Sequence, residues 1–201
     1  MLTEPYTQQQ KLWPTEGQHI LAQYDKEAIV VYQAYKPSIG LFAAKHQYFG
    51  GDFSYSRMSW IKTSFLWMMY RSGWGTKPNQ EITLAISLKR SFFDCLLEQA
   101  VVSSFALSSY STHADWELAI AESDVRLQWD PDHSPTGRKL TRKAIQLGLR
   151  GDTLKDFGQR AILSVEDIST FVKEQRKFVQ GNFENLRTPS ERIYIPVSKC
   201  V

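Results

Sequence analysis

The chain has 201 residues, a formal net charge of +3 at pH 7 and a hydrophobic share of 42%. This length suits a single domain, and so small a net charge is no argument for nucleic-acid binding, which would need a local cluster of cations. The 2 cysteines and 4 histidines form no CxxC pair, HExxH motif or dense cluster, so no metal site is expected. No apolar run approaches the roughly 18 residues of a membrane-spanning helix, and residues 1–14 lack the features of a signal peptide, which predicts a soluble, cytosolic protein.

The order of the predicted elements indicates an α+β fold. Residues 1–24 are polar and predict an N-terminal arm with a short helix near residues 17–24, and residues 25–201 predict one compact domain. Runs of β-branched and aromatic residues predict strands at 28–35, 81–88, 124–129 and 191–197. Helical spacing, caps and stop signals predict helices at 37–48, 65–72, 91–104, 138–150 and 164–179. Because strands and helices alternate irregularly, we expect a mixed, mainly antiparallel sheet with flanking helices.

The segment 57–77 combines aromatic side chains with cations in a way that a simple amphipathic helix does not. Thr63 or Ser64 can cap a helix that begins at Phe65, and free backbone N–H groups at such a start favour an anion. Lys62 adds a full positive charge beside them. The segment therefore predicts an aromatic-walled pocket for a phosphate-bearing ligand. The alternative is a core helix whose long cations extend outward to solvent.

Two further side chains are candidates for a site. Gln33 lies inside the predicted strand 28–35, where a buried amide needs a partner, either a neighbouring strand's backbone or a ligand. Glu191 opens the predicted strand 191–197, and a carboxylate at a strand's mouth points into whatever cleft that edge borders. The alternative for Glu191 is a surface ion pair with Arg187 or Arg192.

The predicted helix 138–150 has five cations and no carboxylate. Such a face favours phosphate, so it is a candidate nucleic-acid surface, although an ordinary basic surface helix is as good an interpretation. Its cations are Arg138, Lys139, Arg142, Lys143 and Arg150. The preceding Asp130, Asp132 and His133 read as a turn.

Four long segments carry a family resemblance: VYQAYKPSIGLFA, RMSWIKTSFLWMMYRSGWGTK, QWDPDHSPTGRKLTRKAIQLGLRG and SERIYIP. Together they resemble the family called domain of unknown function 4291, over nearly the whole chain. Three shorter segments, Tyr32–Tyr35 with the following PSIG, Trp60–Trp67, and SERIYIP, are also similar to ADP-ribosyltransferases of the DarT type, which modify DNA. Gln33 stands where those proteins usually have His or Arg.

The second resemblance implies an ADP-ribosyltransferase-like fold and an NAD-dependent enzyme that acts on nucleic acid or a nucleotide, with NAD as a substrate. Gln33 and Glu191 would be catalytic. The residues implied to bind NAD are Tyr32, Tyr35, Arg57, Trp60, Lys62, Ser64, Trp67 and Arg71. The same aromatic and basic residues would also suit a non-catalytic RNA- or DNA-binding module, or another RNA-processing enzyme.

Overall fold

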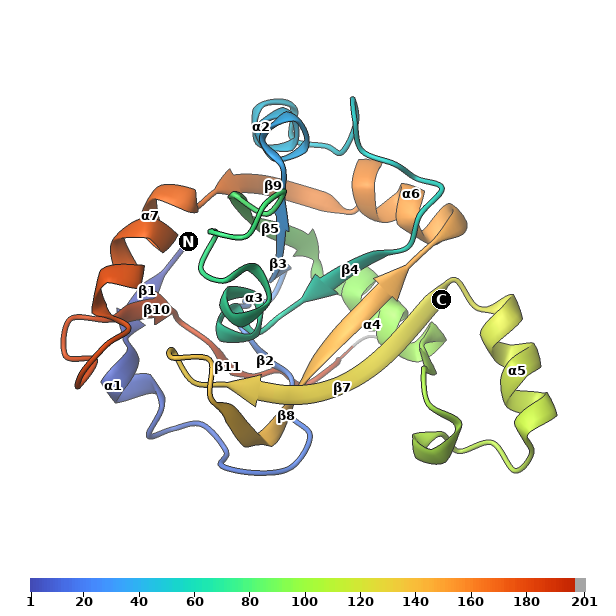
Figure 1. The fold of residues 1–201 in the computed structure, drawn as a ribbon. Coiled ribbons are helices and arrows are strands. Elements are labelled where there is room, and N and C mark those ends of the chain that lie inside the picture. The colour runs from blue at the N-terminus through green and yellow to red at the C-terminus, as the bar shows by residue number, and fades with distance from the viewer. Residues whose placement is uncertain (198–201) are drawn as a thin grey trace.

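The computed structural model describes residues 1–197, so residues 198–201, the last of the predicted domain, lie outside it. Its centre is a seven-stranded sheet with the order β6-β7-β8-β4-β3-β5-β9 (Figure 1). The β6–β7 pair is parallel and every other pair in this sheet is antiparallel, so the expected mixed, mainly antiparallel sheet is confirmed. The strands are β3 (Ala28–Tyr35), β4 (Ser59–Lys62), β5 (Ile82–Lys89), β6 (Val101–Val102), β7 (Val125–His133), β8 (Lys139–Leu149) and β9 (Ile162–Asp167).

Helices flank this sheet and make the protein an α+β domain. The α-helices are α1 (Tyr6–Gln9), α2 (Pro37–His46), α3 (Phe65–Ser72), α4 (Arg90–Gln99), α5 (His113–Glu122), α6 (Gly151–Gln159) and α7 (Ser169–Gln175). Two short 3-10 helices, η1 (Phe105–Leu107) and η2 (Arg176–Phe178), complete the set among residues 1–197. Alternate side chains of β3 serve two cores: Val31 packs in a cluster with residues of α2, α4 and α6, whereas Val30 and Tyr32 pack with residues of α3 and α7.

The two ends of the described chain lie side by side. β1 (Thr3–Pro5) pairs with β10 (Arg187–Pro189), and β2 (Leu21–Ala22) pairs with β11 (Arg192–Ile193), both antiparallel. The helix expected near residues 17–24 is therefore wrong, because β2 occupies part of that segment. The strand predicted at 191–197 is real only over Arg192–Ile193. Residues 1–13 thus form a layer over the C-terminal segment (Figure 1).

The helix predicted at 138–150 is the largest error, since these residues form strand β8. β7 and β8 make a long hairpin whose turn, Ser134–Gly137, has Gly137 at φ +85°. Thr141 and Ile145 are β-branched and suit a strand, and pairing on both sides with β4 and β7 overrides any local helical preference. The turn Ser-Pro-Thr-Gly between two such runs was the hairpin signal.

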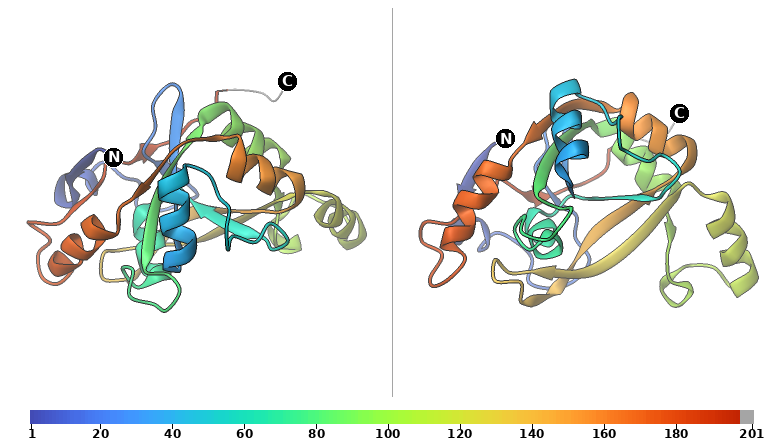
Figure 2. Two further views of the ribbon diagram at one scale, coloured as in Figure 1. Left: turned by 90° about the horizontal axis from the view of Figure 1, so that it is seen from above. Right: turned by 45° about the horizontal axis from the view of Figure 1, so that its top comes forward.

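Other elements were only partly foreseen. The strands predicted at 28–35, 81–88 and 124–129 and the helices predicted at 37–48 and 65–72 are confirmed, whereas the helix predicted at 91–104 ends at Gln99 and strand β6 follows it. β4, α5, α6 and β9 were not predicted, and the last helix begins at Ser169 because β9 takes up residues 162–167. α5 lies at the edge of the molecule, beside the β6–β7 edge of the sheet (Figures 1 and 2). Within residues 1–197, no helix has both the length and the apolar character to cross a membrane.

Candidate functional site

A cavity of about 610 Å³ opens over the middle of the sheet, where β3, β4 and β8 lie side by side. Tyr32 of β3 is opposite Lys62 of β4, which is opposite Gln146 of β8. α3 begins immediately after β4 and forms another wall. The lining residues are Gln33, Ala34, Tyr35, Arg57, Met58, Ser59, Trp60, Lys62, Trp67, Met68, Arg71, Pro78, Asn79, Gln80, Gln128 and Gln146. We expected Gln33, Arg57, Lys62 and Ser64 to line one pocket, and the first three do line this cavity, whereas Ser64 does not.

The cavity has three cations and no carboxylate among its lining residues. Arg57 and Arg71 are exposed, and a guanidinium nitrogen of Arg71 donates to Gln80 Oε1 at 3.4 Å. Trp60 and Trp67 supply aromatic wall. The buried indole Nε1 of Trp67 has no hydrogen-bond partner among the described residues. A positively charged cavity with aromatic walls suits an anionic ligand that also has a flat ring.

Lys62 is the buried cation of this site, with 5% of its surface exposed. Its Nζ lies 4.9 Å from the centroid of the Trp67 ring, and it forms no ion pair with a carboxylate of residues 1–197. Burial, followed by the charge of Arg71, lowers the pKa of Lys62 to about 8, and Asp130 acts in the opposite direction. The amine is thus held in the cavity without a protein counter-charge in contact with it.

Only one of the two polar groups of the Gln33 side-chain amide has hydrogen-bond partners within the described residues. Its Nε2 donates to Ser59 Oγ at 2.8 Å and to the carbonyl oxygen of Trp60 at 3.1 Å, which is the neighbouring-strand contact considered for it. Its Oε1 is buried and has no described partner. The hydroxyl of Tyr35 hydrogen-bonds the same Ser59 Oγ at 2.9 Å, and burial raises the pKa of Tyr35. Ser59 links the two cavity residues and was missed because β4 was not predicted.

The β7–β8 hairpin supplies a polar wall that the sequence did not indicate. Gln146 Nε2 donates to Asp130 Oδ2 at 2.6 Å and to Gln128 Oε1 at 3.1 Å. Burial raises the pKa of Asp130, while the hydrogen bond from Gln146 and the charges of Lys62 and Lys143 lower it. Asp130 is therefore not a lining residue itself, but it hydrogen-bonds the lining residue Gln146. Only the pairing of β7 with β8 brings these residues together, so no local motif could have found them.

Glu191 does not line this cavity, and the expectation that its carboxylate opens beside Gln33 and Lys62 is wrong. It is 6% exposed, and its Oε1 accepts the backbone N–H of Phe65, the first residue of α3, at 2.7 Å. Gln9 accepts its backbone N–H, and Trp13 donates to its carbonyl oxygen. Burial raises the pKa of Glu191 well above its usual value, although the bond from Phe65 opposes this. The layer formed by residues 1–13 is the physical reason for its burial.

Ser64 also serves the start of α3 and not the cavity. Its Oγ accepts the Trp67 N–H at 3.3 Å, which confirms the predicted cap, and donates to Asp132 Oδ1 at 3.0 Å. Asp132 in turn pairs with buried Arg142, with Nε–Oδ2 at 2.7 Å. Tyr32, the remaining residue implied to bind NAD, is fully buried, and its ring packs edge-on against Phe65 at 5.6 Å.

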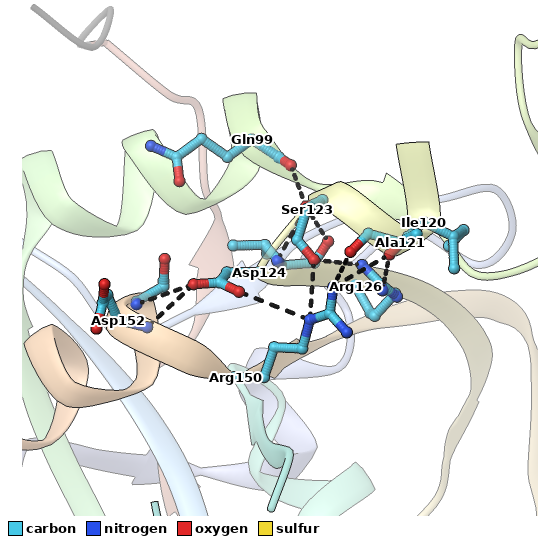
Figure 3. Close-up of polar contacts among 10 residues, drawn as sticks. Gln99, Ile120, Ala121, Ser123, Asp124, Arg126, Arg150 and Asp152 are labelled. Carbon is cyan, nitrogen blue, oxygen red and sulfur yellow. Dashed lines mark hydrogen bonds and ion pairs between the residues drawn. The ribbon is translucent and has the colours of Figure 1, made fainter. Parts of the chain in front are cut away.

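The five cations expected to form a nucleic-acid face do not share one. Arg142 is buried with Asp132. Arg150 faces the C-terminal end of α5, where it donates to carbonyl groups together with Arg126 and pairs with Asp124 at 3.6 Å (Figure 3). Arg138 and Lys139 are exposed and Lys143 is partly exposed. The reason is the strand conformation of β8, which separates residues that a helix would place together.

Comparison with known proteins places the chain in a family. The model for Domain of unknown function (DUF4291) matches residues 19–194. The chain belongs to this family. The match spans the whole cavity lining and Glu191, so the site lies within the family's shared domain. No curated protein matches the chain. Among residues 1–197, no group of three or more His, Cys, Asp or Glu side chains is arranged to hold a metal ion.

Proposed function

We propose that the protein is an NAD-dependent ADP-ribosyltransferase-like enzyme that acts on nucleic acid or a nucleotide. One observation carries the proposal. The cavity gathers Arg57, Lys62 and Arg71 with two tryptophans, and no carboxylate lines it. Its volume of about 610 Å³ is within the few hundred to about a thousand cubic ångströms typical of small-molecule sites. A dinucleotide offers the two complementary features, a pyrophosphate and flat rings.

The cavity residues divide the recognition of NAD among them. Arg57, Lys62 and Arg71 pair with the pyrophosphate, because charge-assisted hydrogen bonds to phosphate are the strongest available here. Trp60 or Trp67 stacks on a ring. The buried Oε1 of Gln33 has no partner among the described residues, and a rotation of this side chain would let it accept a hydrogen bond from a ribose hydroxyl or the nicotinamide amide.

The transfer step breaks the bond between nicotinamide and ribose C1′ and forms a bond from C1′ to the acceptor. Nicotinamide leaves with the bonding electron pair, and the acceptor loses a proton. We assign the stabilisation of positive charge on the ribose and the uptake of that proton to Asp130, which does not line the cavity itself but adjoins it through its hydrogen bond with the lining residue Gln146. Glu191 enters as a positioning residue, because its contact with Phe65 holds the helix that bears Trp67 and Arg71.

Calorimetry with NAD tests the binding step. Arg57→Gln and Arg71→Gln should each weaken NAD binding by about tenfold, the effect of losing one charged hydrogen bond. Arg160→Gln is the matched control, since its side chain is 80% exposed and pairs with Asp156 on α6, away from the cavity lining. Equal losses in all three variants, or no NAD binding by the native protein, would contradict the proposal.

Transfer itself is measured with NAD labelled in its adenylate half and mixed oligonucleotides as acceptors. Label should pass to the oligonucleotide with the native protein. Asp130→Asn should lower that rate by roughly two to four orders of magnitude. NAD bound without any transfer to nucleic acid, nucleotide or protein would reduce the proposal to a binding function.

A non-catalytic nucleic-acid-binding function is the second candidate, and one exposed ring favours it. Tyr70 of α3 is 43% exposed and stacks on buried His133, with ring centroids 3.6 Å apart. Lys77 lies over the same ring at 5.9 Å. A fixed aromatic face beside cations suits a nucleobase. Thermal stabilisation by oligonucleotides and not by NAD would favour this function.

A further inference from the structure

Lys62 differs from every other lysine of residues 1–197, because it alone is buried. Its amine ends inside the cavity, against Trp67, without a hydrogen bond or ion pair to the described protein. Leaving a buried charge without a partner is costly, so burial shifts this amine toward its neutral form. Its pKa of about 8 follows, and Arg71 and Asp130 are the charged groups that act on it from α3 and β7.

Such an amine has a chemical use beyond holding phosphate. A lysine that loses its proton near neutral pH is a nucleophile toward carbonyl carbon. Arg57 and Arg71 lie in the same cavity and would hold a phosphate on the same molecule. Trp60 and Trp67 of the same lining supply an aromatic wall for a ring on that molecule.

We infer that Lys62 is a covalent binding site for a phosphate-bearing aldehyde or ketone. This inference stands apart from the proposed use of NAD, which needs only the charge of Lys62. The neutral amine nitrogen forms a bond to the carbonyl carbon and gives up its two protons, while the carbonyl oxygen takes up two protons and leaves as water. The product is an imine, and addition of water reverses the step. The Asp130–Gln146 pair is the adjoining group through which protons enter and leave.

Pyridoxal 5′-phosphate is the probe, because it bears both an aldehyde and a phosphate and its imine absorbs visible light. The protein is mixed with an equimolar amount at pH 8, reduced with borohydride, digested and mapped by mass spectrometry. Label at Lys62 should exceed label at exposed Lys77 by on the order of tenfold or more, because burial favours the nucleophilic neutral amine of Lys62 and because Arg57 and Arg71 hold the phosphate of the probe in the same cavity. Pyridoxal, which lacks the phosphate, should lose most of this preference.

Two variants separate reactivity from charge. Lys62→Arg keeps the cation and removes the nucleophile, so cavity labelling should disappear, whereas Lys77→Arg should leave labelling at Lys62 unchanged. Arg57→Gln should lower labelling by the phosphate-bearing probe and not by pyridoxal, which keeps the test valid if Lys62→Arg does not fold. Label spread evenly over exposed lysines, or equal labelling by the two probes, would overturn the inference.

Protection by NAD distinguishes this inference from the proposed function. If both hold, NAD should block labelling of Lys62. Selective labelling that NAD does not affect would leave the covalent site standing and count against NAD binding in the cavity. NAD binding with no selective labelling of Lys62 would support NAD binding in the cavity and overturn the covalent site.

Discussion

At the scale of single residues, the protein places two ionisable groups of opposite sign where water is scarce. Lys62 faces the cavity, and Glu191 lies 2.7 Å from the first N–H of α3, outside the cavity lining. Burial is the main cause of both pKa shifts: it lowers the pKa of Lys62 and raises that of Glu191, so each shift favours the neutral form of the side chain. The sequence placed both residues in one site, but only Lys62 lies there.

The raised pKa of Glu191 sets a pH dependence of stability. A carboxyl whose pKa is higher in the folded state binds more protons there, so it favours folding below its ordinary value of 4.5 and this contribution is lost as pH rises above it. Glu191→Gln keeps an acceptor for Phe65 and carries no charge. In chemical denaturation at several pH values, the Glu191→Gln variant should lose less stability than the native protein as pH rises above about 4.5. At pH 7 the variant should be at least as stable as the native protein. Exposed Glu174→Gln is the control, and identical pH profiles for all three proteins would contradict this account.

At the scale of elements, α3 depends on one side chain that the sequence did identify. Ser64→Ala removes the acceptor for Trp67 N–H and leaves Asp132 with one donor fewer. We expect a loss of about 1–2 kcal/mol in the free energy of unfolding, measured with urea. Thr112 caps α5 in the same way, but α5 buries no residue. Thr112→Ala should therefore change global stability by a few tenths of a kcal/mol at most, and an equal loss in both variants would refute the distinction.

The same contrast explains how much of the fold the sequence could predict. β3 and α3 were predicted correctly because their own residues carry the signal. β3 is rich in β-branched residues, and α3 has a serine cap at its start and Gly73 at its end. β8 was wrongly predicted as a helix because the strands that pair with it, β4 and β7, cannot be recognised from the residues of β8 alone. The cavity cations of β4 and α3 were therefore predictable, whereas Gln128, Asp130 and Gln146 were not.

At the scale of the whole molecule, the layer formed by residues 1–13 joins the two chain ends to the centre. Trp13 is 6% exposed, donates to the carbonyl of Glu191 and lies under the guanidinium of Arg142 at 5.0 Å. Trp13→Ala should cost about 3–5 kcal/mol, the usual loss for a large buried aromatic residue. Trp116→Ala on peripheral α5 should cost clearly less. Thermal melting of the two variants checks this, and equal melting temperatures would mean that the N-terminal layer does not support the fold.

The position of Glu191 also bears on how the protein is made. A ribosome synthesises a chain from its N-terminus to its C-terminus. Helix α3 is therefore made long before Glu191, whose carboxylate accepts the first N–H group of that helix. Until that residue emerges, Phe65 lacks this acceptor, and β1 and β2 have no strands to pair with. The cavity wall that α3 forms can therefore reach its final order only after synthesis of the domain is nearly complete. Nascent chains stalled before residue 191 should hold Trp67 and Lys62 in a looser arrangement than the released protein.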